Sequence, residues 1–365
     1  MIDKALDIIE GARERIAEAR RKQIAVWEGD KSIPLPLLMG GRIPGDLQKS
    51  LSWYSTKEIH YDLDKMFHNG LLNALSAVCG GADAVPSMRA NMGCGIFPSL
   101  MGVMPLLFDD KMPWVKDHLT KEQLSQMTPD DITITEEFAM AVKHMQYMAK
   151  KLGDSPVHIY PPDLQGPFDT AHIVYGDAIF YDIYDDPAFV HHLLDLSCHA
   201  IVLGMEKSLE VIPGADGVVA HYNNLVIPGS MGGLKISEDT STLLSPHSID
   251  EFVVPYTTRV LEHFGGGYIH YCGKNDYLLE AVLGIDKNIG LNFGDPQKHD
   301  MDAVLKQVAA AGKVFYGSVN RQQSETDRDF FKRVRDASNE RLLLVFDVGD
   351  KDTGEVIADW EESGV

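Results

Sequence analysis

Apolar residues recur at helical spacing in several long segments of the chain. The clearest segment opens with Thr133 and Glu136, which match a capping box, and stops at Gly153. Three further segments have the same periodicity: 186–210, 248–265 and 300–313. Ser248, with Glu251 three residues later, would cap the second of these three. The pattern therefore predicts four long helices between residues 133 and 313.

Short apolar or β-branched runs that end in polar or turn residues surround these helical segments. The runs are ADAVPSMRAN, PVHIYPPDLQ, DGVVAHYNN, GGLKISEDT, GYIHYCGK, NIGLNFGD, KVFYGSVN and RLLLVFDVGD. From residue 268 onward, strand and helix alternate steadily, and parallel neighbouring strands need a crossover helix between them. The alternation predicts right-handed βαβ units and a parallel sheet.

A doubly wound sheet and a closed barrel both satisfy this alternation, and two features favour the barrel. No glycine-rich phosphate loop follows an early strand, and polar residues stand at the carboxyl end of nearly every run. Residues 1–29 form a charged amphipathic segment, typical of a helix. We therefore predict a single (β/α)₈ TIM barrel over 1–365, in which residues 1–50 are an N-terminal helical extension.

Composition and charge narrow the class of protein. The chain has 33 basic and 54 acidic residues, a formal net charge of −21, and no run of Lys or Arg that would attract a phosphate backbone. It has neither the apolar core of a signal peptide nor an evident apolar run of 18 residues. We expect a soluble cytoplasmic protein that binds neither nucleic acid nor a membrane and keeps its four cysteines as thiols.

The segment YIHYCGKN contains a candidate metal-binding pair. Strand side chains alternate between faces, so His270 and Cys272 project to one side and Tyr271 to the other. Zinc accepts imidazole nitrogen and thiolate sulfur. Taken alone, the pair is equally compatible with a buried histidine beside a small apolar thiol.

Further ligands would have to come from other strand ends. Glu238 and Asp239 follow one strand, and Asp347 closes the last one. Each of these carboxylates is also a plausible turn or N-cap residue. Cys94, in a glycine-containing loop, is an alternative thiol ligand or a buried bystander.

Six polar residues near the ends of the predicted strands are candidates for binding a substrate. They are Arg89, Gln165, Asp169, His221, Asn292 and Asn320. Gln165 could equally satisfy loop backbone groups, and His221 could be a hydrogen-bonded core residue. The sequence contains no G-x-S-x-G elbow, P-loop or H-E-x-x-H helix, so hydrolase, nucleotidase and zinc protease functions lack their usual motifs.

The order of several segments resembles the uroporphyrinogen decarboxylase superfamily. The segments are DAVPSMRANMG, LQGPFDTAHIVYG, YDDPAFVHHLLDL, ISEDTSTLLSPHSIDEFVVPY, IHYCG and IGLNFGDP. Within the superfamily, the chain is similar to the methyltransferases that act with corrinoid proteins, whose zinc motif is His-x-Cys followed by a distant cysteine. His270 and Cys272 match the motif, whereas Asp347 stands where the last cysteine is expected, and Glu238 matches an acidic ligand of some relatives.

The resemblance implies methyl transfer between a small methylated compound, or a thiol or pterin acceptor, and a corrinoid carried by a separate protein. Glu238, His270 and Cys272 would be catalytic, and zinc would be held by His270, Cys272, Asp347 and Glu238. A metal-free decarboxylase of uroporphyrinogen type is an alternative, although only Arg42 stands where that enzyme has several arginines. A non-catalytic barrel that binds a small molecule is another, and the sequence leaves open whether a homodimer forms.

Overall fold

The largest sheet has six parallel strands. The computed structural model describes residues 2–50, 53–214 and 217–364, and the strand order is β1-β12-β11-β10-β9-β8. These strands are β1 (Leu37–Leu38), β8 (Leu234–Ser237), β9 (Gly267–Tyr271), β10 (Asn288–Phe293), β11 (Val314–Gly317) and β12 (Leu342–Val345). The predicted parallel sheet and its alternation with helices are confirmed.

Six further strands form three separate pairs. The pairs are parallel β2 (Ser87–Arg89) with β5 (His158–Tyr160), and antiparallel β3 (Pro105–Leu106) with β4 (Trp114–Val115) and β6 (Val218–His221) with β7 (Leu225–Pro228). One parallel bridge, Gln165 to Ser237, links the segment after β5 to β8.

The closed barrel that the sequence predicts is not confirmed, because the sheet of the described residues is open. Pro161 and Pro162 follow β5 and have no N–H group to donate, so the strand ladder stops there. DGVVAHYNN, expected as one more parallel strand, instead forms the antiparallel β6 of a hairpin. The structure is a mixed α/β fold with a parallel sheet at its centre.

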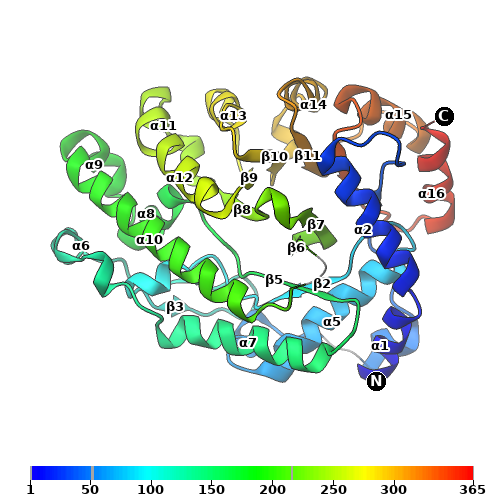
Figure 1. Ribbon diagram of the computed structural model, residues 1–365, viewed down its shortest axis with the longest axis horizontal. Coiled ribbons are helices and arrows are strands. Elements are labelled where there is room, and N and C mark those ends of the chain that lie inside the picture. Colours follow the sequence, from blue (N-terminus) through cyan, green and yellow to red (C-terminus); the bar gives the residue numbers. More distant parts are fainter. Residues whose placement is uncertain (1, 51–52, 215–216, 365) are drawn as a thin grey trace.

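Helices pack along one side of the six-stranded sheet, and other helices pack against β2 and β5. Figure 1 shows α11, α13, α14 and α15 along one side of the six-stranded sheet, and α5, α7 and α10 beyond β2 and β5. The helices are α1 (Ile2–Glu10), α2 (Arg13–Glu28), α3 (Gly45–Ser50), α4 (Thr56–Ile59), α5 (Leu63–Cys79), α6 (Lys121–Gln126), α7 (Glu136–Leu152), α8 (Pro167–Tyr175), α9 (Ile179–Asp185), α10 (Pro187–Val211), α11 (Pro246–Phe252), α12 (Val254–Phe264), α13 (Asp276–Leu283), α14 (Met301–Ala310), α15 (Asp327–Ser338) and α16 (Thr353–Glu362).

Helix boundaries follow the capping chemistry closely. Asp186 caps α10 and Asp300 caps α14, at the first residues of two segments that the sequence predicts to be helical. Helix α7 is capped by Thr135, two residues later than expected. The segment 248–265 is two helices rather than one: Ser245 caps α11, and α12 begins anew at Val254 because Pro255 cannot donate a backbone hydrogen bond.

The first 50 residues are part of the core rather than an extension alone. The predicted N-terminal helix is interrupted near Gly11, and β1 pairs with β12 inside the main sheet. The buried Gln23 side chain donates to Asp83 O and accepts from Val226 N. Trp27 Nε1 donates to Val226 O, so α2 is joined to the β6–β7 hairpin, as Figure 1 shows.

Helix α10 is long and apolar enough to cross a membrane by length and composition, contrary to the expectation that no such run exists. However, 61% of its most apolar stretch is buried inside the protein, and Leu193, Leu194 and Ala200 are fully covered. A core helix of a globular protein has the same composition. The hydropathy of α10 is explained by its packing.

Gly290 is a testable point of close packing on β10. A Cβ at this position would lie 2.9 Å from the Trp27 ring and 2.7 Å from Val314 O. We expect Gly290→Ala to lower the free energy of unfolding by about 1–3 kcal/mol, because neither neighbour can move freely. Urea denaturation measures the change. Gly45→Ala is the matched control: Gly45 is exposed, a Cβ there meets nothing within 4 Å, and little change is expected.

Candidate active site

The strand register gathers the candidate residues at one edge of the sheet. In the parallel ladder, His270 on β9 is paired with Ser237 on β8 and with Asn292 on β10. All three stand at or near the carboxyl ends of their strands. Asp239 follows β8 by two residues, and its Oδ1 accepts the backbone N–H of Cys272 at 2.6 Å.

Asn292 determines how the His270 ring is protonated. Its amide nitrogen donates to the carbonyl oxygen of Tyr316, which can only accept, so its amide oxygen must face His270 Nδ1. His270 therefore donates from Nδ1 and presents the lone pair of Nε2. Burial, and next the charge of Lys235, lower the pKa of His270, which favours this neutral form.

His270, Cys272 and Asp239 form a cluster of potential metal ligands. Nε2 of His270 is 3.6 Å from Cys272 Sγ and 3.7 Å from Asp239 Oδ1, and one ligand atom from each residue lies within 4.8 Å of the others. Gly294, just after β10, leaves room for the thiol, because a Cβ there would clash with Cys272 Sγ. Burial, with the Asp239 carboxylate, raises the pKa of Cys272 to about 12.

Glu238, the acid expected from the sequence, points away from this cluster. Its buried carboxylate accepts hydrogen bonds from Ser241 Oγ at 2.7 Å and from Thr257 Oγ1. Burial raises the pKa of Glu238 to about 7. Asp239, at the bend where the chain leaves β8 and enters the next helical turn, is the residue whose carboxylate faces His270.

Asp169, on α8, holds the turn that carries Asp239. Its two carboxylate oxygens accept the backbone N–H groups of Asp239 at 2.7 Å and Thr240 at 2.8 Å. Burial, and next the Glu238 carboxylate, raise the pKa of Asp169 well above its usual value. In the described residues, Asp169 does not line the cavity described below, and it acts on the site through the backbone.

Four other candidate residues from the sequence lie apart from the cluster. Asp347 is exposed, and its carboxylate accepts the backbone N–H of Gly349. Asn320 is exposed as well, and its carbonyl oxygen accepts from Arg333. Gln165 is buried, with its backbone in the bridge to β8. The thiol of Cys94 is outside the cluster, and burial raises its pKa to about 12.

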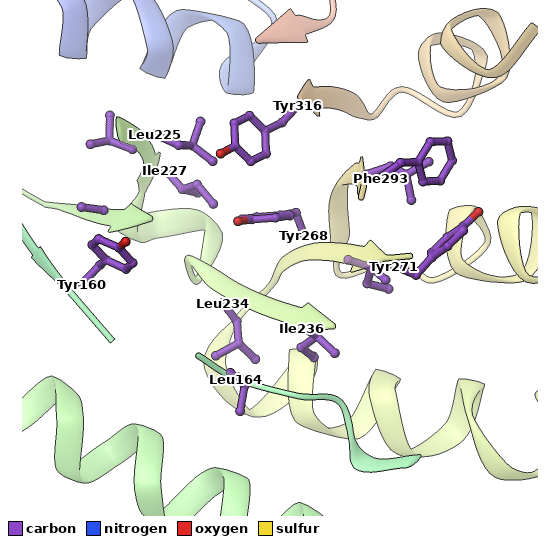
Figure 2. Packing of buried hydrophobic residues seen from close by; sticks show 14 of the residues in the cluster. Tyr160, Leu164, Leu225, Ile227, Leu234, Ile236, Tyr268, Tyr271, Phe293 and Tyr316 are labelled. Atoms are coloured by element: carbon purple, nitrogen blue, oxygen red, sulfur yellow. The ribbon is translucent and has the colours of Figure 1, made fainter. Parts of the chain in front are cut away.

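A cavity of about 370 Å³, partly open to solvent, lies between the strands beside His270. Arg89, His221 and Asn292, all expected from the sequence, contribute to its wall together with several tyrosines. Figure 2 shows Tyr160 from β5, Tyr268 from β9 and Tyr316 from β11 projecting toward one another, with Tyr271 on the opposite side of β9. His270 is the member of the ligand cluster that also lines this cavity.

An ion cluster absent from our sequence-based candidates lies in the cavity wall. Asp163 Oδ1 is 2.8 Å from Lys235 Nζ and 3.3 Å from a guanidinium nitrogen of Arg89. Burial raises the pKa of Asp163, but the charges of Lys235 and Arg89 outweigh it and hold the pKa well below its usual value. One feature of the sequence could have indicated this ion cluster. A lysine stands inside the apolar run GGLKIS, and an isolated cation in a buried strand is uncommon.

His221 stays neutral in this wall. Its Nε2 donates to the carbonyl oxygen of Gly233 at 2.6 Å, and its ring meets Tyr268 edge to face at 5.3 Å. Burial lowers the pKa of His221 to about 4. His221 lines the cavity as predicted, but it lies at the end of an antiparallel hairpin strand and not of a strand in the parallel sheet.

These features define an α/β protein whose candidate site lies at the carboxyl ends of adjacent parallel strands. No family model and no curated protein matches the sequence. A methyltransferase from Methanosarcina mazei has a similar structure, with a TM-score of 0.67 over 95% of this chain and 99% of that chain and a sequence identity of 15%. The protein therefore has a fold that is found in a methyltransferase.

The role of Asp169 can be tested by its removal. Asp169→Ala leaves two backbone N–H groups without their acceptor, and we expect the free energy of unfolding to fall by about 1–3 kcal/mol. Chemical denaturation measures the loss. Asp177→Ala, which removes an exposed carboxylate from the segment after the same helix, should cost much less. Equal losses in the two variants would contradict a structural role for the Asp169 hydrogen bonds.

Proposed function

We propose that the protein is a methyltransferase related to the uroporphyrinogen decarboxylase superfamily. It would move a methyl group between a small methylated substrate, or a thiol or pterin acceptor, and a corrinoid carried by a partner protein. The observation that carries the proposal is the convergence of His270, Cys272 and Asp239 beside a cavity between the strands. The structural similarity to a methyltransferase supports it.

The donor set fits a zinc ion. An imidazole nitrogen, a thiol and a carboxylate oxygen are all zinc ligands, and three protein ligands leave a fourth position for a substrate, as in catalytic zinc sites. The hydrogen bond from His270 Nδ1 to Asn292 is the supporting contact that zinc-binding histidines generally make. We therefore place the metal on Asp239 rather than on Glu238 or Asp347.

A bound zinc ion would act as a Lewis acid toward the heteroatom of the substrate. It would stabilise that atom either as a thiolate nucleophile or as the leaving group from which the methyl departs. The residues of the chain perform the positioning. Asn292 holds the His270 ring so that Nε2 faces Cys272, and Asp169 holds the turn so that Asp239 faces both. The strands around the cavity would limit the access of water to a bound substrate.

Decarboxylation of a tetrapyrrole has less support from the same site. The cavity of about 370 Å³ is near the small end of the range of about 300–1,000 Å³ for small-molecule pockets. The positively charged side chains in its described wall are Arg89 and Lys235, and both already contact Asp163. A substrate with many carboxylates would lack partners in such a cavity.

Metal content tests the ligand assignment. Protein purified without chelator should contain about one zinc ion per chain, and His270→Ala, Cys272→Ser and Asp239→Ala should each lose most of it, because three ligands are the minimum for such a site. Asp347→Ala is the matched control and should retain zinc, since its carboxylate lies in a separate turn. Loss of zinc in Asp347→Ala with retention in Asp239→Ala would reverse our assignment.

Transfer itself is tested with a Co(I) corrinoid and a panel of methyl ethers, thioethers and methylamines. We expect a methylated corrinoid to form, detected by its absorbance change, and Asp239→Ala to slow its formation. Zinc binding without transfer to or from any corrinoid would favour a non-catalytic binding protein instead.

Asn292 offers a subtler test of the same centre. Asn292→Ala removes the partner of His270 Nδ1 without removing a ligand, and we expect about 10- to 100-fold weaker zinc binding. Competition with a chromophoric chelator measures the affinity. Asn320→Ala, an exposed asparagine outside the cavity wall, should bind zinc as the unaltered protein does.

A further inference from the structure

We infer that the inner part of the cavity binds a carboxylate, so that the substrate is a short methylated carboxylic acid. This inference rests on the proposed function, to which it adds a substrate class. The observation behind it is the group formed by Arg89, Lys235, Tyr160 and Tyr268 in the cavity wall.

The cavity wall carries more positive than negative charge. Arg89 and Lys235 both contact the same oxygen, Oδ1 of Asp163, so two cations share one carboxylate. The side chains of the three residues are only 16%, 20% and 22% exposed, and water therefore screens the remaining charge poorly. A second carboxylate, supplied by the substrate, would balance the cluster.

Two hydroxyl groups lie beside these cations with donor capacity to spare. Among the described residues, no side chain or backbone group accepts a hydrogen bond from the hydroxyl of Tyr160 or Tyr268, and the two residues are 8% and 1% exposed. Figure 2 shows both rings projecting into the same space. Burial raises the pKa of Tyr160 to about 12, so its hydroxyl remains a donor at neutral pH. Neither hydroxyl is among the fully buried unpaired atoms and both residues line the cavity, so a carboxylate oxygen of a bound substrate could accept a hydrogen bond from each.

The register indicates the length of the substrate. Lys235 on β8 is paired with Tyr268, and Ser237 is paired with His270, so the backbone of Lys235 lies two residues, or about 7 Å, deeper in the cavity than the ligand cluster. Its Nζ donates to Ser237 Oγ, so the ammonium group reaches back toward the level of His270. A carboxylate near Lys235 and a methyl-bearing sulfur, oxygen or nitrogen near His270 would therefore be joined by a short chain.

Binding of matched acids and amides tests the inference. The probes are 3-(methylthio)propanoate and methoxyacetate, each compared with its own amide, and binding to the purified protein is measured by calorimetry and saturation-transfer NMR at up to millimolar concentration. We expect each amide to bind about tenfold more weakly than its acid, because the charge-assisted hydrogen bonds are lost. No detectable binding of either acid, or equal binding of acid and amide, would overturn the inference.

Two variants with opposite expected effects separate charge from structure. Lys235→Met should weaken binding of the acids about tenfold and leave the amides little changed, whereas Asp163→Asn should tighten it, because the native carboxylate competes for both cations. Lys274→Met, which removes a half-exposed cation outside the cavity wall, is the control and should bind as the unaltered protein does. Weaker acid binding in both cavity variants would show a merely structural role and overturn the inference.

These measurements need no corrinoid, so the two proposals can fail separately. Selective binding of acids without methyl transfer would contradict the proposed function alone. Methyl transfer that is equally fast from acids and from their amides would contradict the carboxylate site alone.

Discussion

The parallel register of β8, β9 and β10 is the constraint on which the candidate site depends. It sets Ser237, His270 and Asn292 side by side, and from this row follow the hydrogen bond of His270 to Asn292 and the approach of Asp239 to Cys272. A slip of one residue would turn the imidazole to the other face of the sheet, where Tyr271 packs against Phe293. The apolar residues that pack against these strands stabilise this register, and they therefore also keep the site residues in position.

The β6–β7 hairpin and α2 connect this row to the rest of the protein. Tyr316 donates from its hydroxyl to Tyr222 O, and its carbonyl oxygen receives the amide of Asn292, so the same residue contacts the hairpin end and the site. On the far side, Gln23 and Trp27 of α2 satisfy backbone groups of the hairpin. Buried polar groups that are paired in this way stabilise a single arrangement, because each would be costly to leave unpaired.

The fold was predictable where local chemistry decides the outcome. The segments that begin at Asp186 and Asp300 are helices as expected, with these two residues as N-caps, and the apolar runs after residue 268 are parallel strands. The antiparallel course of DGVVAHYNN was not predictable, since an apolar run looks the same in either direction and its partner β7 lies only four residues ahead. Strand β1 is two residues long, too short for any periodicity to reveal.

For the site, the sequence by itself determined that His270 and Cys272 share a face, because side chains alternate along every strand. It could not choose between the adjacent acids Glu238 and Asp239. That choice depends on the path of the chain after β8, which the hydrogen bonds from Asp239 N and Thr240 N to Asp169 determine. Likewise, Asp163 and Lys235 are 72 positions apart in the sequence. Only the tertiary structure brings their charges together, because ion pairs depend on distance in space and not along the chain.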